Sequence, residues 1–241
     1  MRNLRPLAAL ILVAPLAAQT VVIQPAPGAR ATETRTVGLA AGAPLRVSNV
    51  NGRIRVTGWD RAEVEFTGAF KPGRGGEQVK VVLEPRQGGL EVRGEYPKNG
   101  NNGPECQMEL KVPRSALSSL ETVNGSLEVR EVSGKVAVKT VNGEITLELL
   151  GGGLKAETVN GSIRGSGIGD QVEARTVNGD IRLSTKGLKG RLEAKTLNGT
   201  LKIKGEGATD VQVSKRHMGA TFGGGDRPLR LETLNGDITL D

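Results

Sequence analysis

A four-residue phrase, Thr-Val-Asn-Gly, recurs along this chain at a nearly fixed spacing. It places an asparagine at 124, 142, 160 and 178, and Thr-Leu-Asn-Gly repeats it at 198 and 235. An early copy lacks the threonine, and a degraded copy at 218–221 lies between the last two. A fixed period of this length is typical of a stacked, quasi-one-dimensional architecture. The repeated turn consists of Asn51, Gly52, Asn124, Gly125, Asn142, Gly143, Asn160, Gly161, Asn178, Gly179, Asn198, Gly199, Asn235 and Gly236.

Apolar residues alternate with polar residues on both sides of each Asn-Gly. Before the asparagine they stand six and four residues earlier, with threonine two residues earlier. After it, they stand three and five residues later. A period of two is typical of a half-buried strand. Each repeat is therefore predicted to form a strand, an Asn-Gly turn, a second strand and a Gly-rich turn.

Two all-β architectures fit this pattern. Asn-Gly between alternating strands is a strong signal for an antiparallel hairpin. In a β-solenoid the same dipeptide is a corner, and each strand pairs with its copy one rung away. Identical threonine, asparagine and aliphatic positions in every unit are expected of like-on-like stacking, which a hairpin does not require. We predict a parallel β-helix-like solenoid with rungs of 18 residues, with an antiparallel β-hairpin meander as the alternative.

Two outward columns follow from this alternation. Three residues before the asparagines, the sign of charge alternates through Glu121, Lys139, Glu157 and Arg175, and Lys195 follows. Opposite charges on neighbouring rungs attract weakly and help to set the register. The position directly before each asparagine is aliphatic: Val123, Val141, Val159, Val177, Leu197 and Leu234.

The aliphatic column has two interpretations, because exposed aliphatic rows are unfavourable in water. The favoured one is a corner that begins one residue early and tucks these side chains inside. The alternative is an interface for weak homo-oligomerisation. The last rung, residues 237–241, is expected to leave an open β-edge, which adds weight to that alternative.

We expect the sequence to divide into four parts. Residues 1–18, with Arg2 and Arg5 ahead of an uncharged apolar stretch, are typical of a signal peptide. We expect residues 19–35 to be a flexible leader, 36–115 irregular N-terminal β-rungs with long loops, and 116–241 regular solenoid repeats. No second apolar run reaches the roughly 20 residues needed to cross a membrane. The chain is therefore predicted to be exported to the periplasm, the cell surface or the medium.

Composition argues against several partners and chemistries. Residues 116–241 carry 17 basic and 16 acidic side chains and aromatic residues are only 2% of the chain, so we expect no nucleic-acid partner. Cys106 is the single cysteine, which leaves no intramolecular disulfide and is expected to be a small buried side chain. His217 is the single histidine and lacks a nucleophile in motif spacing, so we interpret it as a surface turn residue.

Catalytic carboxylates are the remaining possibility. Glu144, Asp180 and Asp237 all lie two residues after a repeat asparagine. Asp180 and Asp237 are expected three repeat units apart, whereas glycoside chemistry needs two carboxylates about 5–10 Å apart. We expect no cofactor, no metal and no enzyme activity.

The motifs carry a family resemblance. Residues 50–60 (Val-Asn-Gly-Arg-Ile-Arg-Val-Thr-Gly-Trp-Asp), Val112-Pro113 and the Thr-Val-Asn-Gly ladder resemble the bacterial putative-adhesin family of exported β-strand-repeat proteins, over roughly residues 35–241. The resemblance implies a β-helix-like fold at the cell envelope and no catalytic residues. The function expected is a non-enzymatic envelope scaffold or adhesin-like module that binds an envelope glycan or protein. The alternatives are an envelope-stress or assembly partner and a polysaccharide-active β-helix enzyme.

Overall fold

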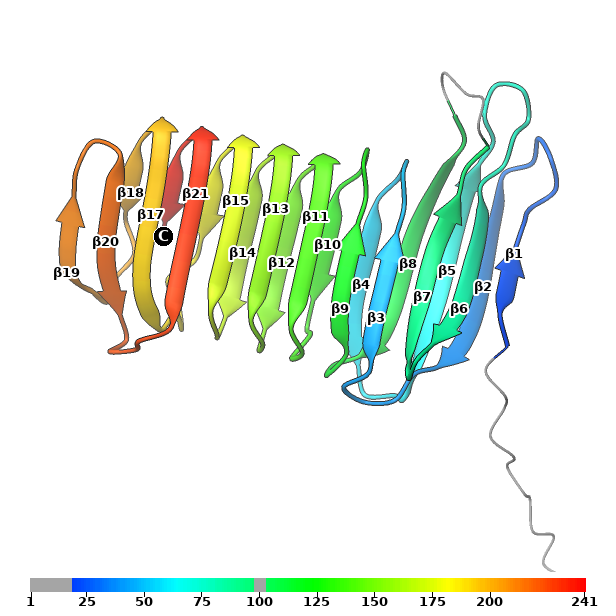
Figure 1. The fold of residues 1–241 in the computed structure, drawn as a ribbon, viewed down its shortest axis with the longest axis horizontal. Coiled ribbons are helices and arrows are strands. Elements are labelled where there is room, and N and C mark those ends of the chain that lie inside the picture. Colours follow the sequence, from blue (N-terminus) through cyan, green and yellow to red (C-terminus); the bar gives the residue numbers. More distant parts are fainter. Residues whose placement is uncertain (1–18, 98–102) are drawn as a thin grey trace, which may run out of the picture.

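The computed structural model describes residues 19–97 and 103–241, and these form two facing β-sheets with no helix among them (Figure 1). The predicted signal peptide, residues 1–18, lies outside the described residues. The first sheet, sheet A, contains in spatial order β1 (Val21–Ile23), β6 (Lys80–Arg86), β7 (Gly89–Glu95), β3 (Pro44–Ser48), β9 (Leu117–Glu121), β11 (Val136–Asn142), β13 (Leu154–Asn160), β15 (Val172–Asn178), β21 (Pro228–Asn235), β17 (Gly190–Asn198), β20 (His217–Phe222) and β19 (Ala208–Val213). The second, sheet B, contains β18 (Leu201–Ile203), β22 (Ile238–Leu240), β16 (Ile181–Leu183), β14 (Ile163–Ile168), β12 (Ile145–Leu150), β10 (Leu127–Arg130), β4 (Ile54–Trp59), β8 (Glu105–Pro113), β5 (Glu63–Lys71) and β2 (Ala31–Gly38).

The predicted solenoid is confirmed, and the hairpin alternative is wrong for the stack. The two strands on either side of an Asn-Gly belong to different sheets, so the dipeptide is a corner. From β9 to β16, each strand pairs in parallel with its copy 18 residues away, as β11 does with β13 and β12 with β14. Equivalent residues stand side by side, with Thr140 beside Thr158 and Ile145 beside Ile163. This like-on-like register is the reason that the columns repeat.

The core between the sheets contains the aliphatic columns predicted from the alternation. Ile145, Leu147, Ile163 and Ile181 are at most 2% exposed. Threonines two residues before each asparagine are also buried, at 1–6%. A single rung buries too few such side chains to offset the entropy of ordering its backbone, so the rungs depend on one another.

The order of the rungs in space differs from their order in the sequence. The last two strands, β21 and β22, lie between β15/β16 and β17/β18 and pair in parallel on both sides. The open β-edge expected at residues 237–241 is therefore wrong. The degraded copy at 218–221 is not a rung either, because β20 runs antiparallel to β17 and forms a hairpin with β19. That segment keeps the alternation of a strand, with Met218, Ala220 and Phe222 buried, but lacks the Asn-Gly corner.

The N-terminal part combines one true rung, β3 and β4, with β7 and β8, which pair in parallel with it, and with antiparallel strands further out. β3 and β4 stack directly on β9 and β10 although the two rungs are 73 residues apart in the sequence. Beyond them lie the antiparallel pairs β6–β7, β5–β8, β2–β5 and β1–β6. The expected flexible leader at 19–35 is wrong, because it contains β1 and the first part of β2. Both are edge strands with partly exposed residues, and such strands show little hydrophobic alternation in the sequence.

In the described part of the chain, no helix is long and apolar enough to cross a membrane.

Candidate functional site

All seven repeat asparagines stand in one row along an edge of the stack. In the six asparagines that follow Asn51, the side-chain Nδ2 donates to the Oδ1 of the asparagine one rung nearer the N-terminal strands, at 2.8–3.0 Å. The row runs, in spatial order, through Asn51, Asn124, Asn142, Asn160, Asn178, Asn235 and Asn198. Its amides are directed at one another, so the row fixes the spacing of the rungs.

The glycine of each corner is required by close approach of backbone. A Cβ built on Gly143 would clash with the carbonyl oxygen of Gly125, and the same holds for each corner along the row from Gly125 to Gly199. Of these corner glycines only Gly52 has a positive φ, at 123°. The backbone conformation alone would therefore admit other residues, and the tight stacking of corners excludes them.

A buried threonine row reinforces the corners. Thr158 Oγ1 donates to the carbonyl oxygen of Gly143 at 3.1 Å, and Thr140, Thr176, Thr196 and Thr233 make the same contact with the neighbouring rung. Thr122 Oγ1 has no partner in the described part of the chain. The equivalent carbonyl, that of Gly52, accepts instead from Asn49 Nδ2 at 3.3 Å.

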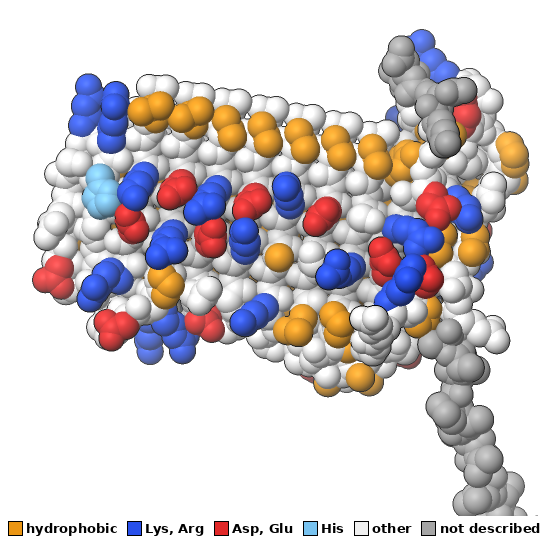
Figure 2. Space-filling view, viewed as in Figure 1, with side chains coloured by type: hydrophobic (Ala, Val, Ile, Leu, Met, Phe, Trp, Pro, Cys, Tyr) orange, Lys and Arg blue, Asp and Glu red, His pale blue; other side chains and the backbone are white. Residues whose placement is uncertain are grey.

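The aliphatic column is a ridge on the surface, so the tucked corner is wrong. We call it the aliphatic stripe: Val50, Val123, Val141, Val159, Val177, Leu234 and Leu197. Its members are 37–45% exposed, apart from the half-buried Val141. The strands of sheet A continue through the asparagine, so the alternation holds to the corner and turns this position outward. Figure 2 shows the stripe as an unbroken line of hydrophobic side chains along the stack.

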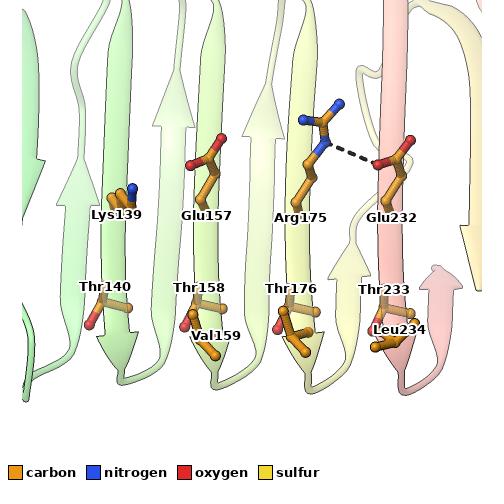
Figure 3. A pocket seen from close by; sticks show the side chains of 11 residues that line it. Lys139, Thr140, Glu157, Thr158, Val159, Arg175, Thr176, Glu232, Thr233 and Leu234 are labelled. Carbon is orange, nitrogen blue, oxygen red and sulfur yellow. Dashed lines mark ion pairs between the residues drawn. The ribbon is translucent and has the colours of Figure 1, made fainter.

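Beside the stripe runs a row of alternating charge on sheet A, which we call the charge row. In spatial order it comprises Glu121, Lys139, Glu157, Arg175, Glu232 and Lys195. Glu232, brought in by β21, separates Arg175 from Lys195 and extends the alternation beyond the four positions predicted (Figures 2 and 3). Arg175 Nε lies 3.0 Å from a carboxylate oxygen of Glu232.

A shallow groove separates the stripe from the charge row. It crosses β11, β13, β15 and β21, has a volume of about 480 Å³, and is lined by members of both rows and by the threonines (Figure 3). The two rows therefore project as separate ridges. An extended partner lying along the stack would contact both.

A second groove, of about 430 Å³, crosses β3, β9, β11 and β13. It lies where a second outward row loses its charges, because Ser119 and Ala137 stand between Arg46 and Lys155. Lys155 is paired with Glu157 at 3.0 Å. No ion pair joins Arg46 or Lys135 to a carboxylate within the described ranges, and both line the groove. We call it the cationic groove.

The sequence did not reveal this groove. Ser119 and Ala137 are unremarkable in the chain, and Arg46 belongs to a rung 73 residues upstream of theirs. The gap in the charged row is readable only once the rungs are aligned in spatial order.

The carboxylates after the asparagines are closer together than expected. Asp180 and Asp237 stand on neighbouring rungs rather than three units apart, because β22 pairs with β16. Each accepts a backbone N–H of the next rung: Asp180 Oδ1 from Asp237 at 2.9 Å, and Asp237 Oδ1 from Thr200 at 2.8 Å. The latter bond lowers the pKa of Asp237, whereas a general acid needs a raised pKa. Glu144, two rungs further, is paired with Arg164.

Two candidate residues from the sequence analysis, Cys106 and His217, remain. Cys106 is fully buried, and burial raises the pKa of its thiol to about 12, which keeps the unreactive protonated form. Tyr96 donates to Asn49 Oδ1 at 2.5 Å and closes the N-terminal end of the asparagine row. His217 is exposed at the start of β20, beside Lys195. No group of three or more histidine, cysteine or acidic residues that could hold a metal ion occurs in the residues described.

The chain is similar to one protein family and to several solved structures. A family model described as Toastrack DUF4097 matches residues 107–241. The crystal structure of a putative cell adhesion protein from Clostridium sporogenes ATCC 15579 is similar over 88% of this chain and 99% of that chain, with 14% identity and a TM-score of 0.56. A putative adhesin from Bacteroides fragilis NCTC 9343 is similar over 89% of this chain and 99% of that chain, with 10% identity and a TM-score of 0.38. No curated protein sequence matches the chain.

Proposed function

The chain belongs to the Toastrack DUF4097 family, and on that premise we propose that it is an exported, non-enzymatic binding scaffold of the cell envelope with an adhesin-like role. The resemblance of its repeats to the putative-adhesin family is confirmed by that membership. The Clostridium structure with the same fold is described as a putative cell adhesion protein, which supports this class of function. Export rests on the signal-peptide pattern of residues 1–18.

The form of the molecule supports a binding role. A stack of rungs joined by backbone ladders, asparagine amides and buried threonines is stiff along its length, so outward side chains keep fixed positions. Binding to such a surface needs little ordering of the protein. The carboxylates best placed for glycoside chemistry, Asp180 and Asp237, instead accept backbone N–H groups, which favours binding over hydrolysis.

The observation that carries the proposal is the cationic groove. Arg46 and Lys135 supply positive charges without carboxylate partners in the described part of the chain, whereas on the far side of the groove Lys155 is paired with Glu157, and Glu173 also lines the groove. The short side chains of Ser119 and Ala137 form the floor of the groove, while Leu117, 44% exposed, adds an apolar contact. Guanidinium and ammonium groups bind carboxylates and phosphates. The ligand class is therefore an anionic envelope polymer, such as a glycan that carries carboxylate or phosphate groups.

Binding can be measured with purified residues 19–241 on an array of polysaccharides that includes polygalacturonate as the anionic probe and dextran as the neutral one. We expect retention on the anionic polymer that weakens as salt rises, since exposed charges are screened. The double variant Arg46→Ser, Lys135→Ser should reduce binding about tenfold, which is about 1.4 kcal/mol in total, or about 0.7 kcal/mol for each exposed charge.

The matched control is Arg182→Ser, Lys202→Ser, which removes the same charge from exposed positions on sheet B. It should leave retention within about twofold of the parent, apart from the general effect of net charge. Equal losses in the two double variants would show non-specific attraction and refute the groove. Equal retention on dextran would refute an anionic ligand.

A further inference from the structure

The aliphatic stripe and the charge row form one continuous surface that nothing in the described chain covers. Val123, Val159 and Val177 are 38–39% exposed, and Leu234 and Leu197 are 43% and 45%. Figure 2 shows the stripe parallel to the alternating acidic and basic side chains along the stack. Contiguous exposed apolar side chains rimmed by charges mark protein–protein contact surfaces.

We propose that this surface binds a second copy of the same chain, with the two stacks antiparallel. The inference is independent of the cationic groove, because it uses a different part of sheet A. It specifies how the two copies are oriented, and it gives the aliphatic stripe a role as a contact between them.

The charge row is complementary to itself when it is reversed. It reads acid, base, acid, base, acid, base across β9, β11, β13, β15, β21 and β17. A two-fold axis that runs along the strand direction, perpendicular to the stack, and passes between β13 and β15 places the row opposite its own reverse on the partner. Glu157 then faces the partner's Arg175. At the other positions, Lys139 faces the partner's Glu232 and Glu121 faces the partner's Lys195, so all contacts join opposite charges.

The same axis lays the stripe against itself. Val159 faces the partner's Val177, and at the ends Val123 faces the partner's Leu197. Asparagine rows then also run side by side at the edge of the interface. A parallel arrangement of the two stacks would instead oppose the charge row to the asparagine row, so no pair of opposite charges would form across the interface.

The alternation also selects the register. A shift by one rung would place bases opposite bases and acids opposite acids, which is unfavourable. A shift by two rungs restores opposite signs but loses contacts at both ends. Because the row holds three acids and three bases, it has no net charge to attract a uniformly charged partner. Its own reverse is the partner that it fits.

The test is sedimentation equilibrium of residues 19–241 between about 5 and 200 µM, a range chosen for a weak dimer with a small interface. We expect reversible dimerisation in the parent. The double variant Val159→Lys, Val177→Lys should remain folded, since both positions are exposed, and should weaken dimerisation at least tenfold. A parent that stays monomeric across the range overturns the proposal. So does a double variant that is folded by circular dichroism and dimerises like the parent.

Charge reversal tests the direction of the partner. Lys139→Glu should weaken the dimer severalfold by facing the partner's Glu232, and the added change Glu232→Lys should restore it. The control Lys202→Glu, on sheet B, should have no such effect. Failure of the second change to restore dimerisation overturns the antiparallel pairing.

Cross-linking gives an independent measurement of orientation in a Cys106→Ala background. A chain with Val123→Cys mixed with a chain with Leu197→Cys should form the mixed disulfide dimer. Copies of Val123→Cys alone should not cross-link, because five strand spacings, about 24 Å, would separate the two cysteines. Cross-linking of Val123→Cys to itself would show a parallel dimer and overturn the proposal.

Discussion

The insertion of β21 and β22 between earlier rungs can be tested by paired cysteines. In a Cys106→Ala background, Arg175→Cys with Glu232→Cys places the two thiols on adjacent strands, which are about 4.8 Å apart. This lies within the Cα separation of disulfides, about 4.4–6.8 Å. Arg175→Cys with Lys195→Cys places them on either side of β21, at about 9.6 Å, which is too far.

The disulfide between positions 175 and 232 also has a calculable effect on stability. It closes a loop of about 58 residues, for which the chain-entropy model gives at most about 4 kcal/mol. Urea denaturation of the oxidised and reduced forms measures this difference. Both double variants lose Arg175, so the 175/195 pair is the matched control for the lost ion pair.

The assay is oxidation followed by thiol titration and mass spectrometry of tryptic peptides. We expect complete cross-linking of the 175/232 pair and free thiols in the 175/195 pair. The reverse result, with 175/195 closed and 175/232 open, would show that rungs stack in sequence order and that the insertion is wrong.

Three further predictions follow from burial and close contact. Ile163→Asp should lower the free energy of unfolding by several kcal/mol, since it buries an unpaired carboxylate between fully covered aliphatic rungs. Arg164→Asp, on the exposed face, should lower it by about 1 kcal/mol or less. Equal effects of the two variants in urea denaturation would contradict the assignment of inward and outward positions. Gly161→Ala should destabilise strongly because its Cβ would meet the backbone of the next corner, while Gly38→Ala, with open space around it, should be nearly neutral. Burial raises the pKa of the Cys106 thiol to about 12, so as the pH rises above about 9 the unfolded chain releases this proton before the folded chain does, and the free energy of unfolding should fall. In Cys106→Ala the fall should be shallower, by up to about 1.4 kcal/mol per pH unit. Identical slopes in the two proteins would refute the burial argument.

The repeated rung was predictable because its signal is local and redundant. Thr158, Asn160 and Ile163 recur at equivalent positions in several rungs, so chance variation at one position does not hide the pattern. Parallel pairing followed from the identity of the columns, which a hairpin does not need. The asparagine row followed from the same argument, although the reason for its glycines, close approach of corners, needed the structure.

The stripe and the N-terminal edge were harder to predict. Whether Val159 faces in or out depends on where the strand ends, and sequence patterns place strand ends only to within a few residues. β1 and β2 pair with strands that follow them by about 60 and 30 residues. Edge strands that expose most side chains have no hydrophobic period to read.

The order of the rungs is a different kind of difficulty, because the same columns recur in every regular rung. Each of these rungs offers a threonine, an asparagine and core positions to its neighbour, and the side chains at one core position differ in size, as Ala174 and Leu231 do. The outward residues differ in charge from rung to rung. Stacked in sequence order, Arg175 would lie beside Lys195, and Glu173 beside Glu193.

Insertion of β21 replaces both like-charge contacts. Glu232 enters between Arg175 and Lys195, and Arg230 enters between the two glutamates of the second row. Two repulsive contacts are removed and four attractive ones are added, each worth about 0.2–1 kcal/mol, so the exchange contributes about 1–6 kcal/mol. That is small beside the burial of a rung, but it favours the observed order over the order of the sequence. The exposed charges of this protein therefore help to determine which rungs become neighbours.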